Sequence, residues 1–263
     1  MTFKTGSRKG RLVYRRHPFA GSRADQAYIW GLKSGDISAF RDSASTIRAR
    51  LSTTHPAMSE LFVATFGRYG RCVSMPDRAF LPSHYCWKLA VNLDNSFESV
   101  LHVPPKLPTT PRLFFGFLAG YSDSEGCWCI YSNKGHPAFA FVMESKDKPI
   151  LLHVRATLRR MGFHPLFYRD VGRGKGRLEL RRRAEVIDLA GRLIPLSKHR
   201  EKRERMSLIL KSHVMNWNEL HLELRKLKFS TREEVAKFVG EAERQYKKLK
   251  KRASSEGSSA SLV

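Results

Sequence analysis

Small residues recur every four positions in one apolar stretch of this sequence, residues 113–126 (LFFGFLAGYSDSEG). These small residues are Gly116, Gly120 and Ser124. Because an α-helix has 3.6 residues per turn, they share one stripe of a helix, with large apolar side chains on either side. A helix with so bare a face lets a second backbone approach closely. The stretch therefore predicts one half of a closely packed helix pair.

A second stretch, residues 26–36 (QAYIWGLKSGD), repeats this spacing. Its small residues are Ala27, Gly31 and Gly35. An acid follows the last small residue of each stretch, and these acids, Asp36 and Glu125, are 89 residues apart, as are Gly31 and Gly120. The equal offset predicts an internal duplication in which two helices bring two carboxylates together. An acid at a helix C-terminus faces the negative end of the helix dipole, so we also expect a cation nearby.

The charge of the chain indicates the class of partner. Its 263 residues carry a formal net charge of +24 and are 41% hydrophobic, which is enough for real hydrophobic cores. Nucleic acid is favoured over an anionic membrane surface, because the basic residues are spread through predicted strands and loops as well as helices. No window approaches the 18 or so uncharged apolar residues of a membrane span, and the N-terminus lacks the apolar core of a signal peptide. We expect an intracellular, cytoplasmic protein that does not insert into a membrane.

Hydrophobic periodicity predicts the same order of elements, helix, strands, helix, strands, helix, in both halves of the chain. In the first half the predicted helices are residues 26–36, 56–66 and 96–103, and the strands are 46–52, 71–74 and 85–92. In the second half the helices are 113–126, 149–161 and 184–194, and the strands are 127–131, 138–144, 166–171 and 177–182. We therefore predict an α+β fold made of two αββαββα repeats.

Composition divides the chain into further parts. Residues 103–112 are rich in proline, which cannot continue a helix or a central strand, so we expect an extended linker there. The predicted parts are a flexible basic arm (1–22), a first domain (23–102), the linker (103–112), a second domain (113–211), appended basic helices (212–252) and a disordered tail (253–263). We expect the appended helices to pack on the second domain or to run along DNA, and residues 230–233 (STRE) to cap the last of them.

The four cysteines lack the paired CxxC spacing of a zinc site. Cys127 and Cys129 flank a tryptophan in a predicted strand, so they point to one face, and we interpret them as buried thiols that act as small hydrophobes. A disulfide between Cys72 and Cys86 is the alternative for the other pair, although it is unusual in a reducing cytosol.

Residues 118–126, LAGYSDSEG, resemble the LAGLIDADG motif of the homing endonucleases, and residues 29–37, IWGLKSGDI, resemble a degenerate copy of it. The first copy departs from the motif at Lys33, Ser34 and Ile37. The resemblance implies two repeats related by a pseudo-twofold axis, each with an antiparallel sheet that forms a concave DNA-binding saddle, and motif helices packed at the domain interface. Two motifs in one chain imply the monomeric type. An intron-encoded enzyme is implied, which makes a double-strand break at a long asymmetric DNA target.

The resemblance also implies roles for individual residues. Asp36 and Glu125 would hold Mg²⁺ or Mn²⁺, because such hard ions prefer oxygen ligands. An ion held in this way can assist phosphodiester hydrolysis. Exposed helix-end acids in a non-catalytic relative are the alternative, and Asp123 is a structural residue rather than a ligand. Strand positions suggest Lys88 and Arg181 as basic catalytic residues. The arginines expected on the concave faces, where each could contact a base, a phosphate or only solvent, are Arg48, Arg50, Arg169 and Arg177.

Two other functions remain open at this point. One is an RNA maturase of the same fold that binds intron RNA and assists splicing. The other is a DNA-binding regulator that does not cleave, although two acids at closely packed helix ends have no role in a pure binder.

Overall fold

The computed structural model describes residues 14–78, 84–101, 107–170, 174–227 and 231–259. The chain divides into two compact units. Unit 1 comprises residues 1–19, 37–101 and 230–263, and unit 2 comprises residues 20–36 and 102–229. The first motif helix belongs to unit 2, whereas we expected it in one domain with residues 37–102. Its packing against the second motif helix explains this membership.

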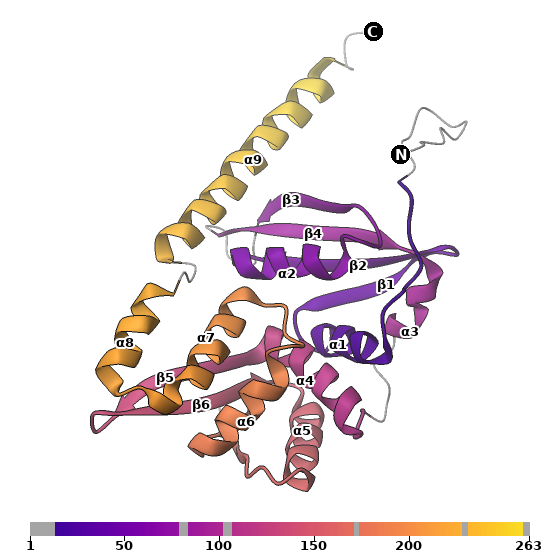
Figure 1. The fold of residues 1–263 in the computed structure, drawn as a ribbon. Helices are drawn as coiled ribbons and strands as arrows, with labels where there is room; N and C mark the ends of the chain where they lie inside the picture. The colour runs from indigo at the N-terminus through magenta and orange to yellow at the C-terminus, as the bar shows by residue number, and fades with distance from the viewer. Residues whose placement is uncertain (1–13, 79–83, 102–106, 171–173, 228–230, 260–263) are drawn as a thin grey trace. The chain divides into compact units, whose positions relative to one another are not determined.

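Unit 1 contains a four-stranded antiparallel sheet with the strand order β1-β2-β4-β3. Its strands are β1 (Ile37–Ser43), β2 (Thr46–Thr53), β3 (Cys72–Arg78) and β4 (Tyr85–Leu93). Alternate residues of β2 point to opposite faces, so Ile47, Ala49 and Leu51 are buried under helix α2 (Pro56–Phe66) while the arginines between them line the open face. The short helices η1 (Asn95–Phe97) and α3 (Glu98–Leu101) follow the sheet (Figure 1).

The sequence did not predict strand β1. Its residues ISAFRDS bury only Ile37 fully and leave the last four exposed. An edge strand paired on one side with so few buried positions shows no alternation of apolar and polar residues, and that alternation is the signal by which a strand is predicted.

Helix α9 (Arg232–Ser259) completes unit 1 by packing on β3 and β4. Trp87 donates its indole N–H to the carbonyl of Phe238 at 2.9 Å, and the rings of Tyr85 and Tyr246 are 5.6 Å apart. The helix therefore packs in unit 1 and not on the second domain, while its contact with DNA stays a prediction. Its capping box uses Thr231 and Glu234, one residue later than expected, and the helix continues into the predicted tail as far as Ser259.

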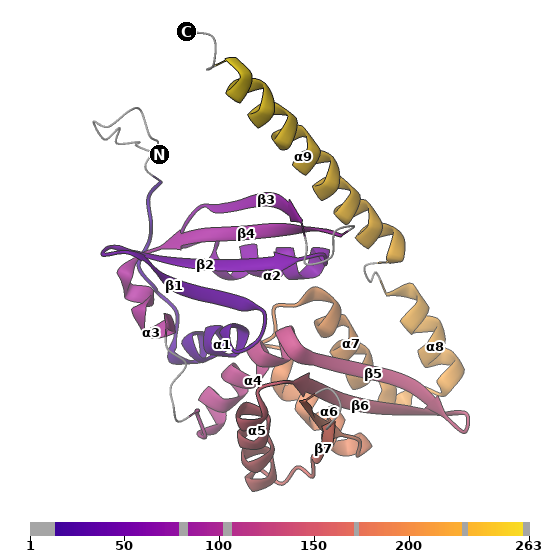
Figure 2. The ribbon, with the colours of Figure 1, turned by 180° about the vertical axis from the view of Figure 1, so that it is seen from behind.

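Unit 2 repeats the topology with the strand order β5-β6-β8-β7. Its strands are β5 (Gly126–Asn133), β6 (His136–Ser145), β7 (Leu166–Asp170) and β8 (Lys175–Leu180). Helices α5 (Lys148–Arg160) and α6 (Arg183–Leu193) cover one face of this sheet, as both ribbon views show (Figures 1 and 2). The shared strand order confirms the predicted α+β fold of two similar repeats.

The remaining helices of unit 2 are α1 (Arg23–Lys33), α4 (Pro111–Glu125), α7 (Arg200–Lys211), η2 (Ser212–Val214) and α8 (Trp217–Lys226). They include the three that form the candidate site, α1, α4 and α7. Ser22 caps α1 through a capping box with Asp25. Pro111 is the first residue of α4, where a backbone N–H would have no partner within the helix. Within the described ranges, no helix combines the length and the apolar composition needed to cross a membrane.

Candidate active site

Helices α1 and α4 touch backbone to backbone. A Cβ atom added to Gly31 would lie 2.1 Å from the carbonyl oxygen of Phe117, and one added to Gly120 would lie 1.9 Å from that of Tyr28. Both distances are far below any van der Waals contact, so only glycine fits at these two positions. The predicted close packing of the two small-residue stripes is confirmed.

This packing brings the two acids to neighbouring helix ends. A Cβ atom on Gly35 would lie 2.3 Å from Cβ of Ser124 and 3.3 Å from Cγ of Glu125, so the turn that carries Asp36 lies against the C-terminal end of α4. Desolvation by surrounding protein raises the pKa of Asp36, although the residue remains exposed. Burial, and then repulsion from Asp36, raise the pKa of Glu125. The two carboxylates therefore interact electrostatically, as the duplication predicted.

A lysine of α7 supplies the cation expected at the end of α4. The Lys202 ammonium donates to the carbonyl oxygens of Ser122, Asp123 and Ser124 at 2.8, 2.6 and 3.2 Å. Burial lowers the pKa of Lys202, and the attraction of nearby acids, Asp36 and Glu125 among them, opposes that shift. The Lys202 ammonium is therefore bound by three carbonyls at the negative end of α4 and attracted by the two nearby carboxylates.

Asp123 has a structural role, as the sequence suggested. Its buried carboxylate accepts hydrogen bonds from the hydroxyls of Tyr28 and Ser197, at 2.7 and 2.6 Å, and from the backbone N–H groups of Lys198 and His199, at 2.8 and 3.2 Å. Burial raises its pKa while these hydrogen bonds oppose the rise. The carboxylate ties α4 both to α1 and to the turn before α7, and so fixes where Lys202 enters the site.

Sequence reasoning missed Lys202. It stands in residues 197–206, SKHREKRERM, among several other basic residues that no spacing distinguishes from it. The only available signal was indirect, namely that an acid at the C-terminus of α4 requires a neighbouring cation. This requirement predicts a positive charge near the end of α4, but it does not predict which part of the chain provides that charge.

The basic residues predicted on the sheet of unit 1 lie on its open face. Arg48 donates to Asn92 at 3.0 Å and pairs with Asp42 at 3.3 Å, while the Arg50 guanidinium lies 4.6 Å from the ring centroid of Phe40. Lys88 pairs with Asp77 on the neighbouring strand β3. Each of these side chains thus has a protein partner in the absence of DNA.

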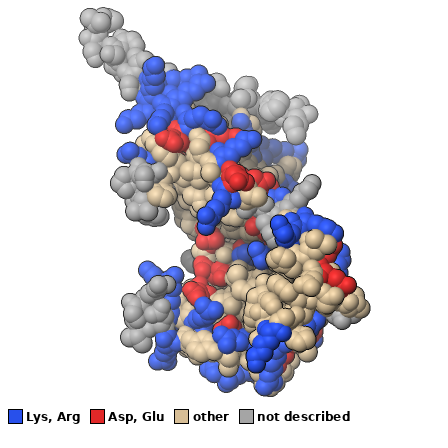
Figure 3. Space-filling model, turned by 90° about the vertical axis from the view of Figure 1, so that its left-hand side faces the viewer, with Lys and Arg blue, Asp and Glu red and all other residues tan. Residues whose placement is uncertain are grey.

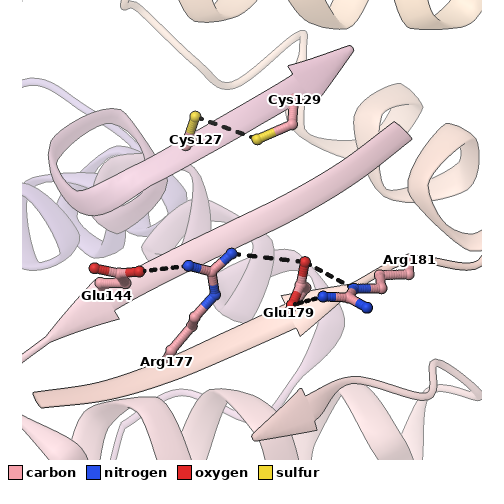
Figure 4. Close-up of polar contacts among 6 residues, drawn as sticks. All are labelled: Cys127, Cys129, Glu144, Arg177, Glu179 and Arg181. Atoms are coloured by element: carbon pink, nitrogen blue, oxygen red, sulfur yellow. Dashed lines mark hydrogen bonds and ion pairs between the residues drawn. The ribbon is translucent and has the colours of Figure 1, made fainter. Parts of the chain in front are cut away.

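The sheet of unit 2 carries a line of alternating charges on its open face (Figure 4). Arg177 pairs with Glu144 at 2.8 Å and with Glu179 at 3.7 Å, and Glu179 also binds Arg181 at 2.8 Å. Lysine and arginine side chains are spread over the face of the molecule seen in Figure 3, with smaller acidic patches between them. The open face of this sheet is therefore polar but locally paired.

Arg169 lies on the other face, contrary to our expectation. The register pairs it with Gly176, where an added Cβ would meet Leu151 of α5 at 3.1 Å. Directly opposed residues in antiparallel strands point to the same face, so Arg169 shares the side covered by α5, whereas Arg177 is one residue out of phase with it. The periodicity of β7 was correct, but its register could not be predicted from sequence.

The cysteine interpretations are corrected as well. Cys127 is exposed and Cys129 is half-buried, and their sulfur atoms are 3.6 Å apart. The contact with Cys129 lowers the pKa of Cys127 to about 6. Cys72 and Cys86 are free thiols whose register partners, Val91 and Asp77, lie on opposite faces of the sheet, so they cannot form a disulfide across β3 and β4.

Comparison with solved structures places this arrangement among known folds. The homing endonuclease I-WcaI bound to its DNA recognition sequence matches with a TM-score of 0.51 and 14% sequence identity, over 69% of this chain and 86% of that one. The chain has the LAGLIDADG fold. A mesophilic variant of the homing endonuclease I-DmoI matches with a TM-score of 0.47 and 16% identity, over 65% of this chain and 95% of that one.

A further matching structure is full-length DUF199/WhiA from Thermatoga maritima. It matches with a TM-score of 0.47 and 13% identity, over 80% of this chain and 68% of that chain. No protein-family model and no curated protein matches the sequence. The likeness is therefore one of fold, and the chemistry has to be argued from this chain's own residues.

In this chain, Asp36 and Glu125 suit a hard divalent cation. Carboxylate oxygens are the ligands such ions prefer, and the raised pKa values mark a place where negative charge lacks full compensation. Within the part of the chain that the structure describes, no group of three or more His, Cys, Asp or Glu side chains could hold a metal ion. An ion at the two acids would complete its coordination with water or with substrate oxygens, as Mg²⁺ commonly does.

Proposed function

We propose that this chain is a site-specific, metal-dependent DNA endonuclease whose active centre contains Asp36, Glu125 and Lys202. The observation that carries the proposal is the meeting of two carboxylates at the ends of two helices in direct backbone contact, beside the half-buried Lys202. Among the described residues, no hydrogen bond or ion pair engages either carboxylate. Two acids left open in this way, in a chain of charge +24, favour chemistry on a polyanion.

The residues divide the work of phosphodiester hydrolysis. Asp36 and Glu125 would hold the ion, and Mg²⁺ or Mn²⁺ bound there would stabilise charge on the phosphate and lower the pKa of a water molecule. Lys202 provides a fixed positive charge that limits the repulsion between the two acids. It also holds the end of α4 rigid through three carbonyls. Rigid support of this kind keeps charged groups aligned without reorganisation during the reaction.

The open faces of the two sheets supply the proposed DNA contacts. Arg48, Arg50 and Arg177 lie on these faces, where arginine can bind guanine edges or phosphates. DNA would replace the acidic partners of Arg48 and Arg177 and the Phe40 ring beside Arg50. Lys88 and Arg181 are the basic side chains proposed to steady the phosphate and the attacking water. Each is exposed and held by one acid, so a phosphate can compete for it. We further propose a monomer that acts on a long asymmetric target, and the presence of two unlike sheets in one chain supports this proposal.

The test is cleavage of a DNA library in the presence of Mg²⁺, followed by DNA that spans the uninterrupted exon junction of a candidate host gene. We expect discrete double-strand cuts with the unmodified chain. Asp36→Asn, Glu125→Gln and Lys202→Met should each lower the rate by about 100-fold or more, because each removes charge from the reacting centre. Asp188→Asn is the matched control, since Asp188 pairs with Arg192 on the exposed side of α6. Cleavage that survives both acid substitutions would contradict the assignment.

One observation favours a second candidate, a DNA-binding regulator that does not cleave. Lys202 already places a positive charge near both acids, so the site has a permanent counter-ion of its own. In that case Mg²⁺ would bind no more tightly to the unmodified chain than to Asp36→Asn, while DNA binding would persist. Calorimetric titration with Mg²⁺ separates the two candidates without relying on cleavage.

A further inference from the structure

The proposed function does not use two cysteine sulfur atoms on the open face of the second sheet, that of the exposed Cys127 and that of the half-buried Cys129. Cys127 and Cys129 lie two residues apart on β5, where the alternation of the strand points both side chains to the same side. Their sulfur atoms are 3.6 Å apart and face one another (Figure 4). Their register partners on β6 are Val142 and Ala140, so no polar side chain opposes them across the strand pair.

The spacing of the two sulfurs suits a shared metal ion better than a disulfide. A disulfide needs sulfurs about 2.05 Å apart and Cβ atoms about 3.5–4.5 Å apart, whereas same-face residues two apart on a strand are separated by about 6.7 Å. The strand would have to deform. Two thiolates each about 2.3 Å from a tetrahedral zinc ion are roughly 3.8 Å apart. The observed 3.6 Å is close to that value without any change in the backbone.

We propose that Cys127 and Cys129 chelate a thiophilic divalent ion of the zinc group on the open face of the second sheet. Binding replaces the two thiol protons, which are released to solvent, and forms two metal–sulfur bonds with no change in oxidation state. Soft thiolates select such ions, whereas the oxygens of Asp36 and Glu125 select Mg²⁺. The chain thus has two chemically distinct metal sites, and the thiolate site stands independently of the proposed endonuclease activity.

The surroundings define how strong this site is. Arg205, Lys202 and Arg177 all lie within electrostatic reach of Cys127, and they offset the negative charge of a thiolate pair while opposing a free dication. Since no cluster of three His, Cys, Asp or Glu side chains occurs in the described ranges, two coordination positions are left to water. The site is therefore open and exchangeable, and weaker than a structural zinc site with four cysteines.

Cadmium is the probe, since thiolate binding produces an ultraviolet charge-transfer band. The reduced, metal-free full chain should bind one Cd²⁺ with this band. Cys127→Ser and Cys129→Ser should each weaken binding by about tenfold or more, while the double variant Cys72→Ser/Cys86→Ser should bind normally. Asp36→Asn should also leave the band intact, and excess Mg²⁺ should not displace Cd²⁺. Circular dichroism confirms that each variant is folded.

The opposite results would overturn the thiolate site. A band that persists in Cys127→Ser, or that disappears in Cys72→Ser/Cys86→Ser, assigns the ion to other residues. Loss of the band in Asp36→Asn, or displacement by Mg²⁺, assigns it to the carboxylate centre. Rapid formation of an intrachain disulfide in air, together with no Cd²⁺ binding by the reduced chain, shows that the pair is a redox couple instead.

Discussion

Helices α1 and α4 share their small-residue stripe but end differently. At the C-terminal end of α4, Lys202 binds three backbone carbonyls, and Asp123 accepts four hydrogen bonds from two parts of unit 2, helix α1 and the turn before α7. Ser34 stands at the position of Asp123 in α1, 89 residues earlier, and its hydroxyl donates only to the carbonyl of Trp30 one turn back. At this matched position, one helix end is therefore held by distant residues, whereas the other bonds only within its own helix.

This difference explains which parts of the motif each copy retains. Gly31 and Gly120 are both present because each touches the backbone of the other helix, so both copies are under the same steric constraint. Positions 34 and 123 are not under a common constraint, because the buried Asp123 alone is enough to tie the helix pair to α7. Asp36 and Glu125 therefore meet in one shared centre. The end of α4 has more hydrogen bonds to hold this centre than the end of α1.

The largest effect that we expect comes from removing the better supported end. Asp123→Ala leaves two hydroxyls and two backbone N–H groups without their buried acceptor, and should lower the free energy of unfolding by about 4 kcal/mol. Ser34→Ala, the matched change in α1, should cost about 0.5 kcal/mol because the hydroxyl bonds only within its own helix. Urea unfolding of both variants measures the contrast. Equal costs would show that the two helix ends are supported alike.

A smaller effect, common to both helices, tests their backbone contact. Gly31→Ala and Gly120→Ala should each cost about 3 kcal/mol, because the added methyl group has to displace a backbone carbonyl. Gly191→Ala in α6 is the control, since its Cβ would meet Leu210 at an ordinary 3.7 Å. That change should stabilise the chain by about 0.5 kcal/mol through the lower entropy of the unfolded state. A mild cost at Gly120 would mean that the helices lie further apart.

The same contrast shows how far sequence reasoning reaches. Periodicity predicted α2 at 56–66 without error, and the four-residue spacing predicted the contact between α1 and α4, because both signals are local or repeated in the chain. Lys202 and the face occupied by Arg169 could not be predicted in this way. The first depends on how α7 returns to the end of α4, and the second on the register of β7 against β8. Both are set by tertiary packing rather than by local pattern.

The exposure of Cys127 and the membership of α1 in unit 2 are also set by tertiary packing, so local pattern did not predict them. An alternating strand shows which residues share a face, but it does not show which face is covered. Cys127 and Cys129 were correctly placed together, and the choice of the buried side was wrong because helices α5 and α6 cover the opposite face. Helix α1 likewise pairs with α4 according to its stripe, whereas its position in the chain suggested the first domain.

The smallest effect that we expect concerns pH and the two acids. The pKa of Asp36 and that of Glu125 are both raised in the folded chain, so each contributes stability below its unfolded pKa and loses that contribution as pH rises through its folded pKa. Asp36→Asn removes one contribution directly. It also lowers the pKa of Glu125, because repulsion from Asp36 helps to raise it. Relative to the unmodified chain, this variant should therefore gain stability as pH increases from about 4 to about 7.

Urea unfolding across that pH range measures the difference curve, and solvent screening of the exposed Asp36 keeps it shallow. Asp188→Asn is again the control, and its difference curve should not show this rise. Adding Mg²⁺ at the upper end of the range should stabilise the unmodified chain more than Asp36→Asn, since only the former retains both ligands. A difference curve that falls with pH would mean that Asp36 is stabilised as an anion, with Lys202 rather than a metal ion as its partner.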